Sequence, residues 1–224
     1  MPRLLFVHGL ESGPGGKKAR ALRAAGFELV AGRMPCGRRA IARDPVVVAS
    51  LVASAAGLIA ATLTWGALGL LVGLLAIAAL QQFGRPLLVR RVLRRSVAVQ
   101  VALLREHEID AVVGSSFGGA VAIELLRRGT WRGPTLLLCP AHELVASRAR
   151  MPAPSLPADA SRIRVVHGRR DQTVPIEHSQ RLVRGTRATL IEVDDDHRLS
   201  QTATSTNLRA WLDPILADPS STQQ

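Results

Sequence analysis

The segment from Pro45 to Gly84 contains no charged side chain, and it restricts the possible folds of this 224-residue chain more than any other feature. A single straight helix of about 36 residues would be ~54 Å long, whereas the hydrocarbon core of a bilayer is ~30 Å thick. We therefore expect the segment to form a helical hairpin or to lie in the plane of an interface. A break at Thr64-Trp65-Gly66 would give two apolar helices, Val46–Leu63 and Ala67–Phe83.

Arginines flank this segment on both sides, at positions 38, 39 and 43 before it and at 85, 90, 91, 94 and 95 after it. An uncharged tip between two arginine-rich ends is typical of a hairpin whose ends face the cytoplasm. We expect residues 45–84 to lie in the inner (plasma) membrane, and 85–105 to be a basic helix near the headgroups. The alternative is self-association, with the helices buried in a soluble cytoplasmic oligomer or lying over the active site.

Small residues at Ala53 and Gly57, and the Gly69-x-x-x-Gly73 spacing, would let apolar helices approach closely, within one hairpin or between copies.

The net charge of +12 would suit nucleic acid, but only 3% of residues are aromatic and no zinc-finger or base-stacking signature accompanies the charge. Nucleic acid is not expected as a partner. Cys36 and Cys139 are isolated, which fits a reducing compartment, and the apolar run at the N-terminus is too short for a secretory signal.

Outside the apolar segment, short strand-like runs alternate with stretches of helical spacing. The predicted strands are 4–7, 27–30, 109–113, 135–138, 163–166 and 189–193, and the predicted helices are 17–25, 118–128, 176–183 and 205–216. This alternation indicates a three-layer α/β fold, with a mostly parallel sheet of about six strands covered on both faces. We expect one discontinuous domain, 1–44 and 85–217, followed by a flexible tail at 218–224.

A G-x-S-x-G motif, Gly114-Ser115-Ser116-Phe117-Gly118, lies between a predicted strand and a predicted helix. A nucleophilic serine at such a junction needs a tight turn, so the residues two before and two after it must be small. Gly114 and Gly118 satisfy this requirement for Ser116 but not for Ser115. Ser116 is therefore the candidate nucleophile.

A serine hydroxyl needs a base, and the base needs a carboxylate to orient it. Asp171 follows the fifth predicted strand, in His167-Gly168-Arg169-Arg170-Asp171, and His197 follows the sixth. The order Ser, Asp, His with all three at strand-to-helix junctions favours Ser116, Asp171 and His197 as a triad. A helix cap for Asp171 and a solvated loop position for His197 are the alternatives, and Asp195 or Asp196 could replace Asp171.

The tetrahedral intermediate also needs backbone N–H donors. We expect these from Phe117 and from Leu10, which follows His8-Gly9 after the first strand, with His8 structural rather than basic. Of the remaining histidines, His107 and His178 are expected at the surface, and His142 is expected to line the pocket.

These motifs together resemble the α/β-hydrolase superfamily, and within it a branch of small bacterial serine esterases. Chains of that branch open with strand, HGxxSxPxxxK and helix, which here runs from His8 to Lys18. The resemblance covers about residues 3–36 and 97–213, and implies an esterase or thioesterase that needs no cofactor or metal. The apolar segment and the three aspartates before His197 depart from the family pattern.

Together these features predict a serine hydrolase that cleaves small acyl esters or lipid-derived esters through an acyl-enzyme. The rival interpretation is a non-catalytic, membrane-anchored scaffold that keeps a hydrolase fold.

Overall fold

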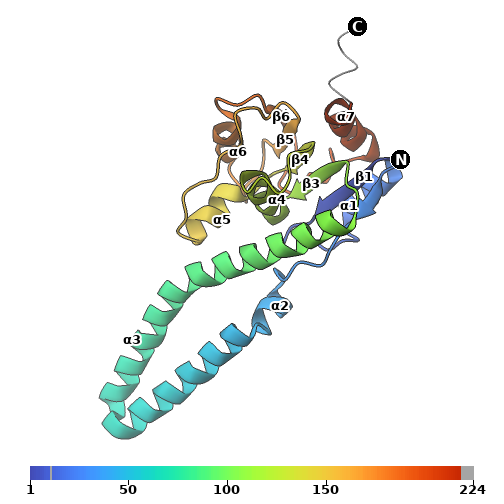
Figure 1. The fold of residues 1–224 in the computed structure, drawn as a ribbon. Coiled ribbons are helices and arrows are strands. Elements are labelled where there is room, and N and C mark those ends of the chain that lie inside the picture. The colour runs from blue at the N-terminus through green and yellow to red at the C-terminus, as the bar shows by residue number, and fades with distance from the viewer. Residues whose placement is uncertain (11, 218–224) are drawn as a thin grey trace.

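A computed structural model of the chain describes residues 1–10 and 12–217, except for the side chain of Arg38; the predicted flexible tail, 218–224, lies outside the described residues. One six-stranded sheet forms the centre, every strand runs parallel to its neighbours, and the strand order is β2-β1-β3-β4-β5-β6 (Figure 1). The strands are β1 (Arg3–Val7), β2 (Glu28–Val30), β3 (Ala111–Ser115), β4 (Thr135–Leu138), β5 (Ile163–Gly168) and β6 (Thr189–Val193). The helices are α1 (Lys17–Ala24), α2 (Arg38–Ala42), α3 (Pro45–Glu106), α4 (Phe117–Arg127), α5 (His142–Arg148), α6 (Ile176–Val183) and α7 (Ser205–Leu216).

Helices cover both faces of the sheet, which confirms the predicted three-layer architecture. Alternate residues of a strand point to opposite faces, so Leu4 and Phe6 of β1 join the core beneath α1 and α7. Leu5 and Val7 join the second core, beneath α3, α4 and α6. The residues of β1, β3 and β4 are buried throughout, apart from Arg3 at the start of β1.

Two short helices were not expected from the sequence, α2 with five residues and α5 with seven. Helices of one or two turns lack a readable apolar period. β3 also starts and ends two residues later than predicted, because its pairing with β4 continues to Ser115 opposite Leu138.

The predicted hairpin is present, and its turn is at Gly66, whose backbone is non-helical (φ 55, ψ −131). The first arm begins at Pro45. The second arm does not end near Phe83 as predicted, but continues as one helix to Glu106. Figure 1 shows that this arm bends on its way to the sheet, and Pro86 inside it lacks the N–H that a straight helix would use.

The second half of this arm belongs to the α/β domain, because Val92, Leu93 and Val97 lie in its core. α3 ends shortly before β3 begins, at the amino ends of the strands. The hairpin therefore leaves the domain on the side of the carboxyl ends of the strands (Figure 1). The boundary expected between residues 84 and 85 falls within a continuous helix.

Contacts at both ends hold the two arms together. Asp44 caps the first arm by accepting a hydrogen bond from the amide of Val46 (2.9 Å), and its carboxylate pairs with Arg91 (3.2 Å) and Arg95 of the second arm. Near the tip, a Cβ added at Gly69 would lie 1.8 Å from the carbonyl oxygen of Ala61. The Gly69-x-x-x-Gly73 spacing thus serves contact within the hairpin, whereas nothing lies within 4 Å of a Cβ added at Gly57.

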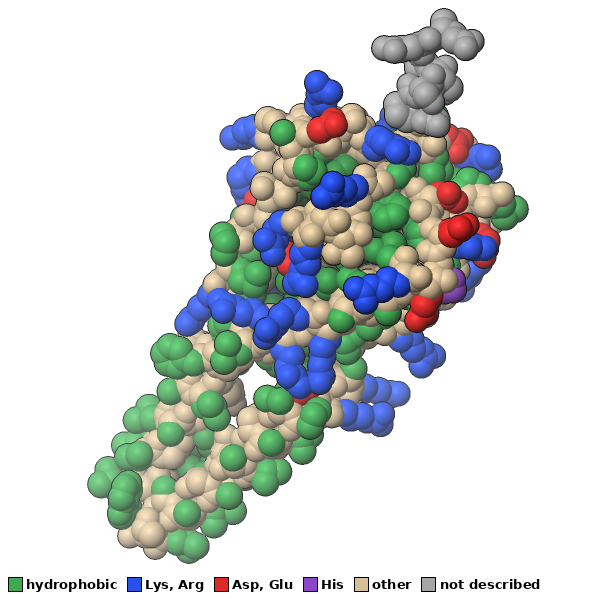
Figure 2. Space-filling view, in the orientation of Figure 1, with side chains coloured by type: hydrophobic (Ala, Val, Ile, Leu, Met, Phe, Trp, Pro, Cys, Tyr) green, Lys and Arg blue, Asp and Glu red, His purple; other side chains and the backbone are tan. Residues whose placement is uncertain are grey.

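Outside the part of the second arm that packs on the domain, the described side chains of the hairpin are mostly exposed. Among the described residues, α3 is the one helix that is long and apolar enough to cross a membrane. Its most apolar 18-residue window is 0% buried. Leu63 is 81% exposed and Trp65 is 63% exposed. Figure 2 shows this apolar projection, with basic side chains gathered where it meets the domain.

Candidate active site

Ser116 lies at the turn between β3 and α4, where the predicted nucleophile should be. Its backbone has φ 55 and ψ −117, in the left-handed region that non-glycine residues rarely adopt. Such a conformation costs about 1–3 kcal/mol and persists only where the surroundings hold it. From this turn, Oγ of Ser116 reaches the loop after β6, where it lies 2.8 Å from Nε2 of His197.

The glycines of the motif permit this turn by allowing backbones to approach. A Cβ added at Gly118 would lie 1.9 Å from the carbonyl oxygen of Val7, and one at Gly114 would lie 2.7 Å from the carbonyl oxygen of Gly118. Both distances are impossible for a real side chain. The size requirement inferred from the sequence is thus met at both positions.

The three predicted triad residues come together, although 81 residues separate Ser116 from His197. Nε2 of His197 lies 2.8 Å from Oγ of Ser116, and Nδ1 of His197 lies 2.6 Å from Oδ2 of Asp171. The Asp171 side chain is buried, and that of His197 is 19% exposed. The carboxylate can therefore hold the Nδ1–H tautomer, which leaves Nε2 free to accept the hydroxyl proton.

Asp171 is held as an anion by its neighbours. Its Oδ1 accepts hydrogen bonds from the amides of Thr173 and Val174, both at 2.8 Å. Burial alone would raise the pKa of this carboxyl, but hydrogen bonds from His167, His197 and the Val174 amide outweigh burial and hold the pKa well below its usual range. The acid is therefore ionised at neutral pH.

Neither alternative acid contacts the His197 ring. The Asp195 carboxylate accepts hydrogen bonds from the amides of Gln201 (2.9 Å) and Thr202 (2.8 Å), so it shapes the loop that carries His197. Asp196 accepts from the amide of Arg198. This loop lies against the end of β5, where a Cβ added at Gly168 would be 2.4 Å from the Asp195 carbonyl oxygen.

The residues expected to supply the oxyanion donors are next to Ser116 in the chain or follow a residue that lies beside it. Phe117 is the first residue of α4, where backbone N–H groups have no partner within the helix. A Cβ added at Gly9, beside Leu10, would be 3.7 Å from Oγ of Ser116. The turn after β1 is therefore next to the nucleophile, and an oxyanion hole formed by the amides of Leu10 and Phe117 stays a prediction.

Comparison with solved structures identifies the fold. A protein from Xanthomonas campestris pv. campestris, provisionally named a hydrolase of the α/β superfamily, superposes with a TM-score of 0.59 at 20% identity, covering 97% of this chain and 100% of that one. The chain has an α/β-hydrolase fold. Est1E from Butyrivibrio proteoclasticus matches this fold with a TM-score of 0.58 at 10% identity, over 97% of this chain and 89% of its own. The ydeN gene product of B. subtilis matches with a TM-score of 0.52 at 14% identity, covering 97% of this chain and 100% of its own. No protein-family model and no curated protein matches the sequence.

The other histidines have different places in this fold. His8 is 5% exposed and its Nδ1 lies 2.8 Å from the carbonyl oxygen of Gly9, in keeping with a structural role. His107 is exposed as predicted. His178 is only partly exposed, because its ring packs against that of His142 at 6.4 Å.

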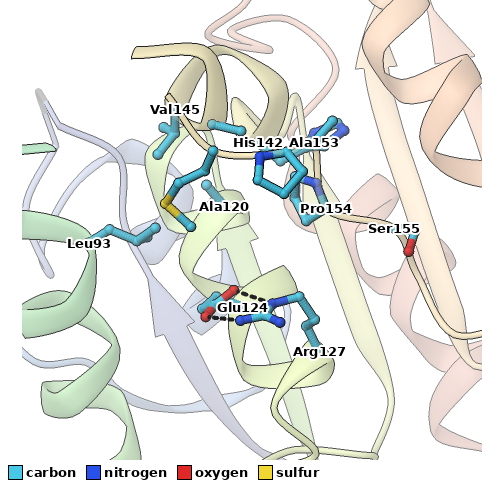
Figure 3. A pocket seen from close by; sticks show the side chains of 12 residues that line it. Leu93, Ala120, Glu124, Arg127, His142, Val145, Ala153, Pro154 and Ser155 are labelled. Carbon is cyan, nitrogen blue, oxygen red and sulfur yellow. Dashed lines mark hydrogen bonds and ion pairs between the residues drawn. The ribbon is translucent and has the colours of Figure 1, made fainter. Parts of the chain in front are cut away.

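His142 lines a cavity of about 360 Å³ beside α4, but Ser116, Asp171 and His197 are not among the residues that line it. In Figure 3, His142 lies towards one end of this cavity and the Glu124–Arg127 ion pair towards the other. His142 therefore lines a pocket other than the expected one, because no triad residue is among those that line it.

Two residues near the triad had no role in the sequence interpretation. Burial lowers the pKa of Lys18 on α1, while Cys139, Asp196 and Asp195 raise it through their charge. His167 is completely buried, and its Nε2 lies 3.2 Å from Oδ2 of Asp171. Its position four residues before Asp171 was visible in the sequence, but the contact depends on how the loop folds.

Cys139, His167 and Asp171 could be considered as metal ligands, since their ligand atoms lie within 4.8 Å of one another. Burial raises the pKa of the Cys139 thiol to about 12, so it carries a proton at neutral pH. Oδ2 of Asp171 accepts a hydrogen bond from His197, and Nδ1 of His167 lies 2.7 Å from Oγ of Ser179. Asp171 and His167 therefore already belong to a network of hydrogen bonds.

Proposed function

We propose that this chain is a serine hydrolase that cleaves carboxylic esters or thioesters through an acyl-enzyme intermediate. The observation that carries the proposal is the hydrogen-bonded series Ser116, His197, Asp171 at a strained strand-to-helix turn. A strained turn persists at a functional site because the site requires the geometry it gives.

In the proposed reaction, Oγ of Ser116 attacks the acyl carbonyl carbon while Nε2 of His197 takes the hydroxyl proton. The tetrahedral oxyanion accepts hydrogen bonds from the amides of Phe117 and Leu10. When the intermediate collapses, the bond to the alcohol or thiol breaks and His197 returns the proton to that leaving group. Water, activated by His197, then attacks the acyl-enzyme and releases the carboxylic acid and free Ser116.

The same proposal assigns the hairpin to a membrane. The first arm, and the apolar part of the second arm up to residue 84, are each about as long as a bilayer core, since 20 helical residues span ~30 Å. The tip carries exposed Leu63 and Trp65, and arginines gather at the base. By the positive-inside rule, arginines at the base of the hairpin favour the cytoplasmic face of the inner membrane for the hydrolase domain.

A lipid-derived ester is the favoured substrate class for a reason of topology. The hairpin leaves the domain on the side of the carboxyl ends of the strands, and the triad lies at those same ends. A membrane around the hairpin would therefore lie on the catalytic side of the sheet. A small soluble acyl ester is the alternative substrate.

The enzymatic claim is tested with the full-length protein in mild detergent, using p-nitrophenyl acetate, butyrate and longer acyl esters. We expect turnover that falls at least about a thousandfold in Ser116→Ala, the order of loss found when a triad member is removed. The neighbouring Ser115→Ala is the matched control and should keep most activity. No Ser116-dependent turnover, together with no labelling of Ser116 by a fluorophosphonate, would favour the non-catalytic scaffold.

The membrane claim is tested by flotation with liposomes made of neutral and anionic phospholipid. The intact chain should float with the vesicles, whereas a variant with residues 45–84 replaced by a short Gly-Ser linker should remain at the bottom of the gradient. A chain that stays soluble as a defined oligomer without detergent or vesicles would refute membrane insertion and favour burial of the hairpin between copies.

A further inference from the structure

A second histidine lies directly behind the catalytic acid. The side chain of His167, the next-to-last residue of β5, is 0% exposed, as is that of Asp171. Nε2 of His167 lies 2.9 Å from the carbonyl oxygen of Val174 and 3.2 Å from Oδ2 of Asp171. Its Nδ1 lies 2.7 Å from Oγ of Ser179 on α6. Each ring nitrogen of this buried histidine therefore has a partner.

These partners fix where the ring hydrogen is. A carbonyl oxygen and a carboxylate oxygen can only accept, so Nε2 must carry a hydrogen to be satisfied by either of them. In the neutral ring, Nδ1 then accepts the hydroxyl hydrogen of Ser179. Ser179 thus donates to His167, and the Nε2–H of His167 donates to the Val174 carbonyl oxygen at 2.9 Å, with Oδ2 of Asp171 3.2 Å from the same nitrogen. Asp171 meets His197 from the other side.

Oδ2 of Asp171 is the atom that both histidines share. It accepts from Nδ1 of His197 at 2.6 Å and faces Nε2 of His167 at 3.2 Å, while Oδ1 is held by the amides of Thr173 and Val174. Rotation of the carboxylate about the Cβ–Cγ bond would move both oxygens together. The two amides at Oδ1 oppose this rotation from one side, and His167 adds a contact at Oδ2, the oxygen that meets His197.

We propose that His167 is a positioning residue for the acid of the triad. It fixes Oδ2 of Asp171 in line with Nδ1 of His197, and Ser179 on α6 holds His167 in the required tautomer and orientation. This inference rests on the proposed serine hydrolase function, because it gives the network a role in that reaction. Groups that orient a catalytic or ligating side chain from behind are commonly worth about 10- to 100-fold.

The first test compares two substitutions at this position. His167→Leu removes both polar contacts, whereas His167→Gln can keep an N–H donor towards Asp171. With p-nitrophenyl butyrate we expect kcat to fall about 10- to 100-fold in His167→Leu, with KM within about twofold, and to return to within about fivefold of the parent in His167→Gln. His142→Leu is the matched control, because His142 is equally buried and has no hydrogen bond to the triad. Its kcat should stay within about threefold of the parent.

The second test does not require turnover. In protein labelled with ¹⁵N-histidine, the hydrogen on Nδ1 of His197 should give a low-field proton resonance, because its bond to Asp171 is short and charge-assisted. We expect the resonance to move upfield or broaden in His167→Leu and to stay near its original position in His167→Gln and His142→Leu. Near-UV circular dichroism establishes that each variant is folded.

The outcomes separate the inference from the proposed function. A folded His167→Leu variant with unchanged kcat, or with an unmoved His197 resonance, would overturn the positioning role. Equal losses in His167→Leu and His167→Gln would do the same, since packing rather than the donor would then matter. If the parent protein has no Ser116-dependent turnover, the proposed function fails, and the resonance alone decides whether His167 orients Asp171.

Discussion

Gly118 allows the start of α4 to pack closely against the end of β1. The substitution Gly118→Ala tests this packing directly. An alanine Cβ there would lie 1.9 Å from the carbonyl oxygen of Val7 and 2.7 Å from that of His8. Ordinary carbon–oxygen contacts are about 3.3 Å or longer. The start of α4 would therefore have to move away from β1 by about 1.4 Å, and no side-chain rotation can relieve a clash with backbone atoms.

This displacement has two costs that can be measured separately. Overpacking a tight core costs typically 1–3 kcal/mol, and a backbone clash should reach the upper end, so we expect the free energy of unfolding to fall by about 3 kcal/mol. A shift of about 1 Å at the reacting atoms costs about 100-fold in rate. Urea unfolding followed by near-UV circular dichroism gives the first quantity, and initial rates with p-nitrophenyl butyrate give the second.

Gly15→Ala is the matched control, because nothing lies within 4 Å of a Cβ added at Gly15. It should change stability by less than about 0.5 kcal/mol, as surface substitutions usually do. If Gly118→Ala unfolds at the same urea concentration as the parent and keeps its rate, the close packing of α4 against β1 is refuted. The account of why the turn needs a glycine would fail with it.

Three further predictions use independent parts of the molecule. Since burial raises the pKa of the Cys139 thiol to about 12, iodoacetamide at pH 8 should modify it on the order of a thousandfold more slowly in the folded than in the urea-unfolded protein, as measured by mass spectrometry; comparable rates would contradict this. The pKa of Asp171 is lower in the folded state than its unfolded value of about 3.9, so the ionised carboxylate stabilises the fold above that pH and this contribution is lost as the pH falls towards the folded pKa. The free energy of unfolding that Asp171→Asn loses relative to the parent, measured with urea, should therefore be largest above about pH 5 and shrink below about pH 4. A loss that stays constant down to pH 3 would count against this stabilisation. Finally, brominated lipids should quench Trp65 at the exposed hairpin tip, and the quenching should disappear in Trp65→Phe; equal quenching in both proteins would place the tip outside the bilayer.

Much of the fold could be predicted because each strand ends in a recognisable junction. Ser116, Asp171 and His197 each follow a strand, and the carboxyl ends of parallel strands meet at one edge of the sheet. Positions far apart in the chain were therefore brought together by topology alone. The turn at Gly66 was predictable for a related reason, since two strands of one sheet require both ends of the insert to return to the same side.

What could not be predicted depends on packing between distant elements. The second arm continues past Pro86 because Val92, Leu93 and Val97 find a buried face against the sheet, which overrides the change from apolar to basic sequence at Arg85. The contact of His167 with Asp171 requires α6 to bring Ser179 beneath β5. Neither arrangement leaves a periodic pattern in the sequence.

The unbroken course of α3 from the hairpin tip to the sheet has a mechanical consequence. The second arm joins the apolar projection to the domain as a continuous helix, so we expect the two to tilt and rotate together. The pairing of Asp44 with Arg91 ties the first arm to the same helix. A lipid surface around the hairpin would set the height and angle at which the Ser116 hydroxyl is presented. The depth of the hydroxyl relative to the bilayer would then help to select substrates, in addition to the chemistry of the triad. It would favour ester groups at one depth below the headgroups.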